Sequence, residues 1–147
     1  MTAKSAFKLT VYGKPQPQGS SRAFIPKGWN RAVITSDNKE LKSFRQEASK
    51  AALVARNEAG FKDVIFGKHV PVEVSFKFFF QRPASVSKKR VEHVVKPDLS
   101  KLVRAAEDSL TGIIFHDDSQ IVSYGSTRKE YGLPERAEIT VTECEAQ

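Results

Sequence analysis

The chain has 147 residues, with 24 Lys and Arg against 17 Asp and Glu, and a formal net charge of +7. This length suits a single domain with its own buried core, which we expect to span residues 1–147. One cysteine excludes an internal disulfide framework, and no apolar run approaches the roughly 20 residues of a membrane span. We therefore expect a soluble, cytoplasmic protein without a membrane partner, and the positive charge favours a polyanionic one.

The N-terminal third predicts a strand, a loop and a second strand. In FKLTVYG, Phe7, Leu9 and Val11 alternate with Lys8 and Thr10, the period of a half-buried strand. Residues 14–28 carry three prolines and two glycines, which predicts an irregular loop. The following RAVITS, residues 31–36, is typical of a short strand.

A long helix is predicted for residues 38–59. Ser36 and Asp37 are suitable caps, apolar residues recur at helical spacing from Leu41 and Phe44 onward, and Gly60 is a typical stop. From Val72 to Phe80 the alternation returns to that of a buried strand. Phe79 breaks its polar face, which indicates either a second packing surface, such as a subunit contact, or extra core beneath the long helix.

The C-terminal segments QIVSYGSTRKEYG and RAEITVTEC predict two strands joined around GLPE as an antiparallel hairpin. The resulting fold class is α+β, a small mixed sheet with a long helix and a shorter helix. That shorter helix begins at Pro97-Asp98 and ends at Gly112. By itself, Asp98 is equally typical of a helix cap, and Arg104 and Asp108 of an i,i+4 ion pair.

Acidic residues cluster around this helix although the chain is basic. Asp98 opens it, and Asp117-Asp118 precede the strand-like IVSYG. Adjacent carboxylates repel, so such a pair is usually solvated at a turn or neutralised by a bound cation. Phosphodiester hydrolysis requires neutralised phosphate charge and an activated water, and Mg²⁺ held by a few carboxylates and by phosphate oxygens supplies both.

A basic stretch, residues 81–96, leads into this helix. It suits either a solvated loop or contact with a nucleic-acid backbone. The candidate DNA-binding residues are Arg82, Lys88, Lys89, Arg90, Lys96 and Lys101.

The run KPDLSKLVRAAEDSLTGIIFHDDSQIV, residues 96–122, resembles the signature of RusA-type Holliday junction resolvases, in which Asp-Leu-Asp-Asn-Leu and a basic residue precede Asp-Ala-Leu and Asp-Asp-x-Gln-Val. The opening strand followed by GKPQP, the long helix and the terminal strands agree in order. The resemblance implies a homodimeric, Mg²⁺-dependent endodeoxyribonuclease, with Mn²⁺ as a possible substitute and no small-molecule cofactor. Its substrate would be a four-way DNA junction, in a phage or prophage setting.

Carried over by position, the resemblance implies metal-binding and catalytic roles for Asp98, Asp117 and Asp118, and a catalytic role for Arg104 in place of a lysine. Asp108 would orient basic groups. One departure stands out: Ser100 occupies the place of a second aspartate. A hydroxyl binds Mg²⁺ far more weakly than a carboxylate.

Three explanations of Ser100 remain open: another carboxylate such as Asp117 or Asp108 completes the site, activity is reduced or uses another metal, or the protein binds junctions without cutting them. We favour a working nuclease, because Asp98, Asp117, Asp118 and a basic residue all remain. A structural RNA-binding domain is disfavoured, since neither an RNA-recognition motif nor a GXXG loop is present.

Overall fold

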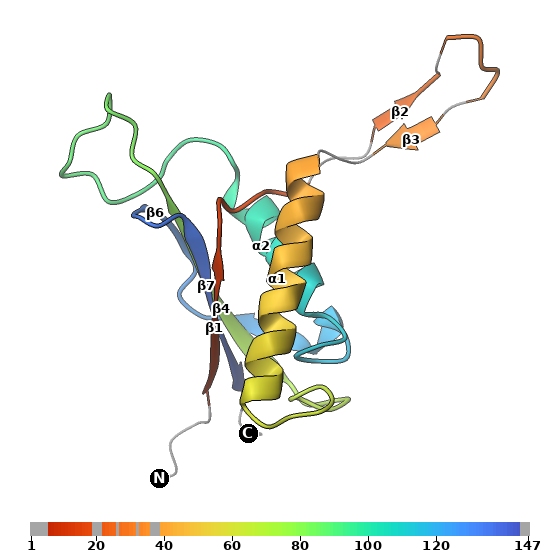
Figure 1. Ribbon diagram of the computed structural model, residues 1–147, viewed down its shortest axis with the longest axis vertical. Helices are drawn as coiled ribbons and strands as arrows, with labels where there is room; N and C mark the ends of the chain where they lie inside the picture. The colour runs from red at the N-terminus through yellow and green to blue at the C-terminus, as the bar shows by residue number, and fades with distance from the viewer. Residues whose placement is uncertain (1–5, 19–21, 26, 32, 36–38, 145–147) are drawn as a thin grey trace.

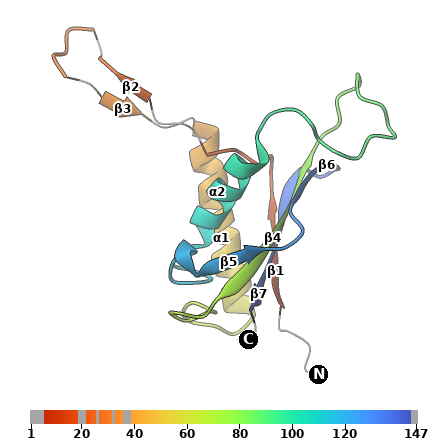
Figure 2. The ribbon, with the colours of Figure 1, turned by 180° about the vertical axis from the view of Figure 1, so that it is seen from behind.

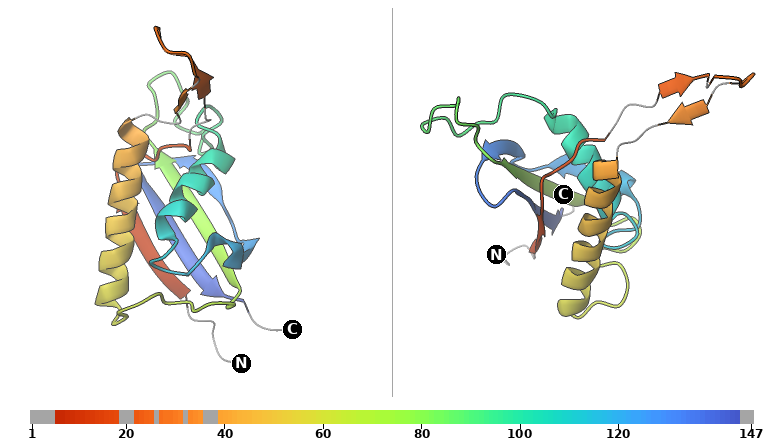
Figure 3. Two further views of the ribbon diagram at one scale, coloured as in Figure 1. Left: turned by 90° about the vertical axis from the view of Figure 1, so that its right-hand side faces the viewer. Right: turned by 45° about the horizontal axis from the view of Figure 1, so that its top comes forward.

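The computed structural model describes residues 6–18, 22–25, 27–31, 33–35 and 39–144. A five-stranded mixed sheet has both helices on the same side (Figure 3), which confirms the α+β class. The elements, in chain order, are β1 (Ala6–Tyr12), β2 (Arg22–Phe24), β3 (Val33–Thr35), α1 (Lys39–Glu58), β4 (Val72–Phe80), α2 (Leu99–Leu110), the 3-10 turn η1 (Asp118–Gln120), β5 (Ile121–Tyr124), β6 (Arg128–Tyr131) and β7 (Arg136–Glu143).

Strand β4 organises the sheet. On one edge it pairs antiparallel with β7, which in turn pairs antiparallel with β1. On its other edge it pairs in parallel with β5 and then with β6. The predicted C-terminal hairpin is therefore wrong: β6 and β7 lie on opposite edges of β4 and do not pair with each other. Sequence proximity favoured the hairpin, but β4 is buried, and its backbone N–H and C=O groups need partners on both edges.

The core lies between the sheet and the helices. Every second side chain of β4, from Val72 to Phe80, is buried, as the alternation predicted. Their partners from the helices are Phe44, Ala48 and Ala52 of α1 and Leu102, Ala106 and Leu110 of α2. Small alanines at these contacts let the helices approach the phenylalanine-rich strand closely. This packing fixes α2, and with it the residues on its outer face.

Phe79 points to the face of the sheet away from the helices, so it does not extend the core beneath α1. Its ring lies under the guanidinium of Arg136, with 3.9 Å between the Arg136 Cζ and the ring centroid. It also packs against Gly132, where an added Cβ would come within 2.8 Å of the ring. Phe79 is thus half-covered by its own chain.

Two expectations near the N-terminus have different outcomes. The loop predicted for residues 14–28 contains β2, which pairs antiparallel with β3, so its description as wholly irregular is wrong. This two-stranded sheet lies apart from the five-stranded one in both Figure 1 and Figure 2.

The long helix is confirmed, and Gly60 follows it with φ of 93°. Its predicted caps, Ser36 and Asp37, lie outside the described residues.

Within the part of the chain that the structure describes, no helix is both long enough and apolar enough to cross a membrane.

Candidate active site

Helix α2 carries the first predicted site residues on its outward side. Its inner side is buried through Leu102, Ala106 and Leu110, so Ser100 and Arg104 are exposed. Asp98 is the N-cap residue, but its side chain makes no capping hydrogen bond. The reading of Asp98 as a simple cap is therefore wrong, and its exposed carboxylate remains available for another role.

Lysines surround Asp98. A pocket of about 340 Å³ brings together Lys14, Lys96, Asp98 and Lys101. The backbone N–H of Gln18 donates to the carbonyl of Lys101 at 2.9 Å, which fastens the segment after β1 to α2. The sequence predicts for Lys14 either contact with phosphate or a place in a mobile loop, and Lys14 is remote from Asp98 in the chain. Only the folded chain brings it to the start of α2.

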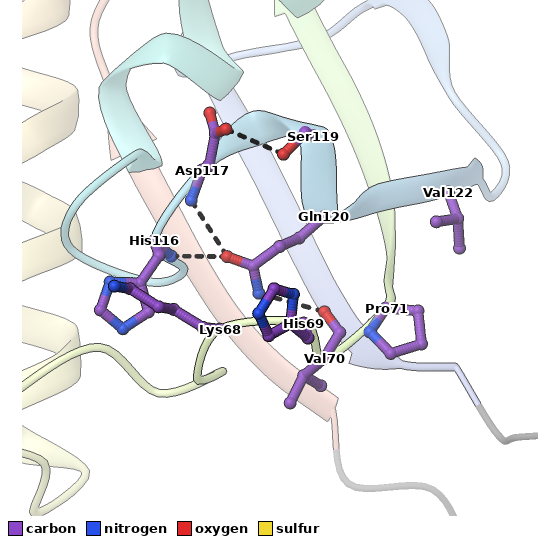
Figure 4. Close-up of a pocket in the computed structure, with 9 residues that line it drawn as sticks. All are labelled: Lys68, His69, Val70, Pro71, His116, Asp117, Ser119, Gln120 and Val122. Carbon is purple, nitrogen blue, oxygen red and sulfur yellow. Dashed lines mark hydrogen bonds between the residues drawn. The ribbon is translucent and has the colours of Figure 1, made fainter.

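The Asp117-Asp118 pair is held in a tight turn by Gln120. The Gln120 Oε1 accepts the backbone N–H groups of His116 and Asp117 at 2.8 and 3.0 Å. Its Nε2 donates to the carbonyl of Gly67 at 2.8 Å. It also donates to the carbonyl of Val70 at 3.1 Å (Figure 4). One buried amide thus joins the aspartate turn to the loop before β4, and both segments are fixed relative to the sheet.

The two aspartates have opposite pKa shifts. Hydrogen bonding with Asp117, partial burial and the Asp117 charge raise the pKa of Asp118. Hydrogen bonds from the Ser119 hydroxyl, at 2.8 Å, and from Asp118 lower the pKa of Asp117. These shifts are those expected of adjacent carboxyl groups that share a proton. The pair therefore holds negative charge that a cation would relieve.

Glu107 on α2 adds a carboxylate that the sequence analysis did not single out. Burial, chiefly, together with the charges of Asp118 and Asp108, raises its pKa. The hydroxyl of Tyr124 donates to the Glu107 Oε2 at 2.6 Å and opposes that rise. Burial and Glu107 in turn raise the pKa of Tyr124 to about 12. The available sequence signal was helical spacing, because Glu107 lies three residues after Arg104.

Asp108 contacts a different partner from the one that its sequence position suggested. The Asp108 Oδ2 lies 3.8 Å from the Arg45 Nη2 of α1. Such a long, half-exposed pair contributes little to stability. The suggested ion pair with Arg104 is not formed, so Arg104 stays exposed on the outer face of α2.

The structure places Asp98 and the Asp117-Asp118 pair at opposite ends of α2. At 1.5 Å per residue, the axial distance from Asp98 to Asp108 is about 15 Å. A groove of about 810 Å³ lies between them and includes Ser100, Arg104, Glu107 and Tyr124. Among the described residues, no three His, Cys, Asp or Glu side chains are arranged as a ready metal-binding group.

The basic stretch divides into exposed and anchoring residues. Lys88, Lys89 and Arg90 are exposed, as backbone-binding residues must be. Arg82 is half-buried, donates to the carbonyl of Arg90 at 2.5 Å and lies 5.5 Å from the centre of the Tyr131 ring. Its contacts are internal, so it shapes the loop that carries the other three.

His93 and Lys129 anchor the end of this stretch. The buried His93 ring stacks on Phe80 at 4.3 Å and meets the edge of Tyr131 at 5.2 Å. Burial, assisted by the charge of Lys129, lowers the pKa of His93. The Lys129 Nζ donates at 2.8 Å to the carbonyls of both Val95 and Pro97. These contacts position the backbone immediately before Asp98.

Comparison with known proteins gives this arrangement its context. Residues 13–142 match the family described as Endodeoxyribonuclease RusA. The chain belongs to the RusA endodeoxyribonuclease family. It is also 33% identical over 149 residues to "Uncharacterized protein YqaN" of Bacillus subtilis (strain 168), an alignment that covers 95% of this chain and 97% of the relative. The RusA family consists of nucleases, which hydrolyse DNA, and its match includes every predicted site residue.

The donor chemistry near Asp118 fits the divalent metal that a RusA nuclease implies. Asp117, Asp118 and Glu107 present carboxylate oxygens, the ligands that Mg²⁺ and Mn²⁺ prefer. The charge of Asp118 contributes to the raised pKa of Glu107, so these two carboxyl groups lie close enough to interact. The residues at this end of α2 therefore supply the type of ligand that a hard cation needs, although within the described part of the chain they do not converge into a group of three. Asp98 does not join them within one chain.

Proposed function

We propose that this protein is a metal-dependent endodeoxyribonuclease that resolves four-way DNA junctions. The observation that carries the proposal is the RusA match across residues 13–142, which includes the rigidly held Asp117-Asp118 pair. The metal-binding residues would be Asp117 and Asp118, with Glu107 beside them. A bound Mg²⁺ would neutralise phosphate charge and activate a water molecule.

The remaining residues have roles that follow from their places along α2. Arg104, exposed in the groove, offers a planar fork that matches two phosphate oxygens. Asp98, at the far end, lies among three lysines and would position their ammonium groups, which would hold the strand there. Lys88, Lys89, Arg90, Lys96 and Lys101 would hold the DNA backbone, which gives affinity without base specificity. This suits an enzyme that recognises branched shape.

The proposed active form is a homodimer. A four-way junction has two-fold symmetry, and paired nicks in opposing strands require two identical sites. Sedimentation of the purified protein, alone and with a junction, tests this part of the proposal. A monomer that cuts one strand at a time would contradict it.

A junction-binding protein without catalysis is the second candidate, and Ser100 favours it. Ser100 lines the groove where the family pattern has an aspartate. A hydroxyl there leaves α2 with one carboxylate fewer along the groove. This candidate predicts tight junction binding that is indifferent to Asp118→Asn.

Cleavage of a fixed synthetic four-way junction in Mg²⁺, Mn²⁺ and EDTA tests the two candidates, with a linear duplex as a comparison substrate. Metal-dependent nicks in the junction that disappear in Asp118→Asn, while binding persists, are the result expected of the nuclease. Asp63→Asn is the matched control, because Asp63 is an exposed aspartate outside the groove. Binding without cleavage, followed by a gain of cleavage in Ser100→Asp, would instead favour the binder.

A further inference from the structure

A second pocket lies beside the Asp117-Asp118 turn and shares no lining residue with the groove. It has a volume of about 590 Å³, and Lys68, His69, His116 and Asp117 contribute to its walls. Neither the family signature nor the basic stretch includes Lys68 or His69. The pocket is open to solvent and lies at the start of β4, beyond the end of α2.

The walls of this pocket are fixed rather than loose. Gln120 joins the two segments that form them, with hydrogen bonds to the carbonyls of Gly67 and Val70 on one side and to the N–H of His116 on the other. His69 has φ of 69°, a left-handed conformation that non-glycine residues seldom adopt. This conformation costs free energy and persists only where the surroundings impose it.

Three of the side chains that line the pocket, those of Lys68, His69 and His116, carry hydrogen-bond donors, and the rest of the lining includes apolar residues and Asp117. In Figure 4, Lys68, His69 and His116 lie on one side of it, whereas the carboxylate of Asp117 points toward Ser119. An ammonium group carries three donors, and each neutral imidazole carries one. Such a group of donors, with one positive charge, suits a phosphate oxygen. The backbone of Asp117 forms the boundary with the proposed catalytic site.

We propose that this pocket binds a backbone phosphate of the DNA strand, next to the phosphodiester that is cut at the Asp117-Asp118 turn. This inference rests on the proposed nuclease function and extends its substrate contact beyond α2. The helix has 12 residues and is about 18 Å long, which corresponds to roughly five nucleotides at 3.4 Å per step of one strand. The lysines around Asp98 would hold the DNA strand at one end of that span. Lys68, which lies beyond Asp117, would hold it at the other end.

The test is junction binding measured over a series of salt concentrations, in the Asp118→Asn background so that cleavage does not interfere. Each phosphate contact contributes about 0.9 to the slope of log K against log salt. Lys68→Gln should therefore reduce the magnitude of that slope by about one. Lys62→Gln is the matched control, because Lys62 is exposed on the same connection but does not line the pocket.

A second variant removes the imidazole of His69. His69→Gly should weaken junction binding roughly two- to tenfold, the range of one lost hydrogen bond, with little change in slope. Glycine adopts the left-handed conformation without strain, so the loop is expected to keep its shape. Unchanged thermal unfolding of each variant confirms that the fold is intact.

The outcomes separate this inference from the function on which it rests. Junction binding with the slope unchanged in Lys68→Gln would overturn the phosphate site alone. A protein that binds no DNA at all would overturn both proposals. If inorganic phosphate shifts the amide signals of residues 68–70 while the junction slope is unchanged, the pocket is an anion site that DNA does not use.

Discussion

The side-chain carbonyl of Gln120 accepts the backbone N–H of Asp117 at 3.0 Å, while the amide nitrogen of the same Gln120 donates to the loop before β4. A carboxylate pair is useful to a nuclease only if its position is fixed, because a displacement of about 1 Å can cost much of the rate. Gln120 supplies that rigidity. It connects the chemistry of the turn to the stability of the sheet.

Replacing Gln120 with alanine should lower the free energy of unfolding by about 2–4 kcal/mol. The substitution leaves two backbone N–H groups and two carbonyls, all in a partly buried region, without their partner. Urea unfolding measures the change. Gln46→Ala is the control: Gln46 is exposed on α1, and its loss should change stability by less than about 0.5 kcal/mol. Equal effects of the two substitutions would contradict the role given to Gln120.

Tyr124→Phe should raise the pKa of Glu107 further above its usual range. The Tyr124 hydroxyl donates to the charged form of Glu107 and so opposes the effect of burial. Carbon-detected NMR titration of the Glu107 carboxyl group measures the shift. Tyr12→Phe, which alters an exposed tyrosine on β1, should leave that titration unchanged. A pKa that falls in Tyr124→Phe would show that the hydrogen bond is absent in solution.

Lys129→Met should release the segment that precedes Asp98. Both 2.8 Å hydrogen bonds from the ammonium group to the carbonyls of Val95 and Pro97 would be lost, at a cost of about 1–3 kcal/mol. Amide hydrogen exchange at His93, whose N–H donates to the carbonyl of Lys129 at 3.2 Å, should become faster. Lys77→Met, on the exposed side of β4, is the comparison. Unchanged exchange in Lys129→Met would mean that this segment is held by other contacts.

The free energy of unfolding should fall as the pH drops below the usual pKa of histidine. Because the pKa of His93 is lowered in the folded protein, the unfolded chain binds a proton more readily. Above about pH 6.5, the unperturbed pKa of histidine, the two states bind the same number of protons at His93. As the pH falls toward the lower folded pKa, the unfolded state binds more protons, and the free energy of unfolding decreases. His93→Phe keeps an aromatic ring against Phe80 and should lose less stability between pH 7.5 and 5.5 by urea unfolding. An identical loss in both proteins would exclude His93 as the cause.

Much of this protein's secondary structure could be predicted from the sequence alone, because it depends on residues that are neighbours in the chain. The alternation in β1 and β4, the helical spacing of α1 and α2 and the stop at Gly60 all follow from side-chain periodicity and backbone conformation, which neighbours in the chain decide. The run from Lys96 to Val122 likewise indicated the family, which the match over residues 13–142 confirms. The roles of its aspartates remain predictions.

Contacts between distant segments required the tertiary structure. The hairpin prediction failed because β4, not the nearest strand, offered β6 and β7 their partners. Glu107 gained a raised pKa only through burial beside Tyr124, and Lys14 reached Asp98 only through the docking of the segment after β1. Lys68 and His69 meet His116 because one glutamine joins their two loops. Burial and long-range hydrogen bonds depend on which segments pack together, and no local pattern encodes that choice.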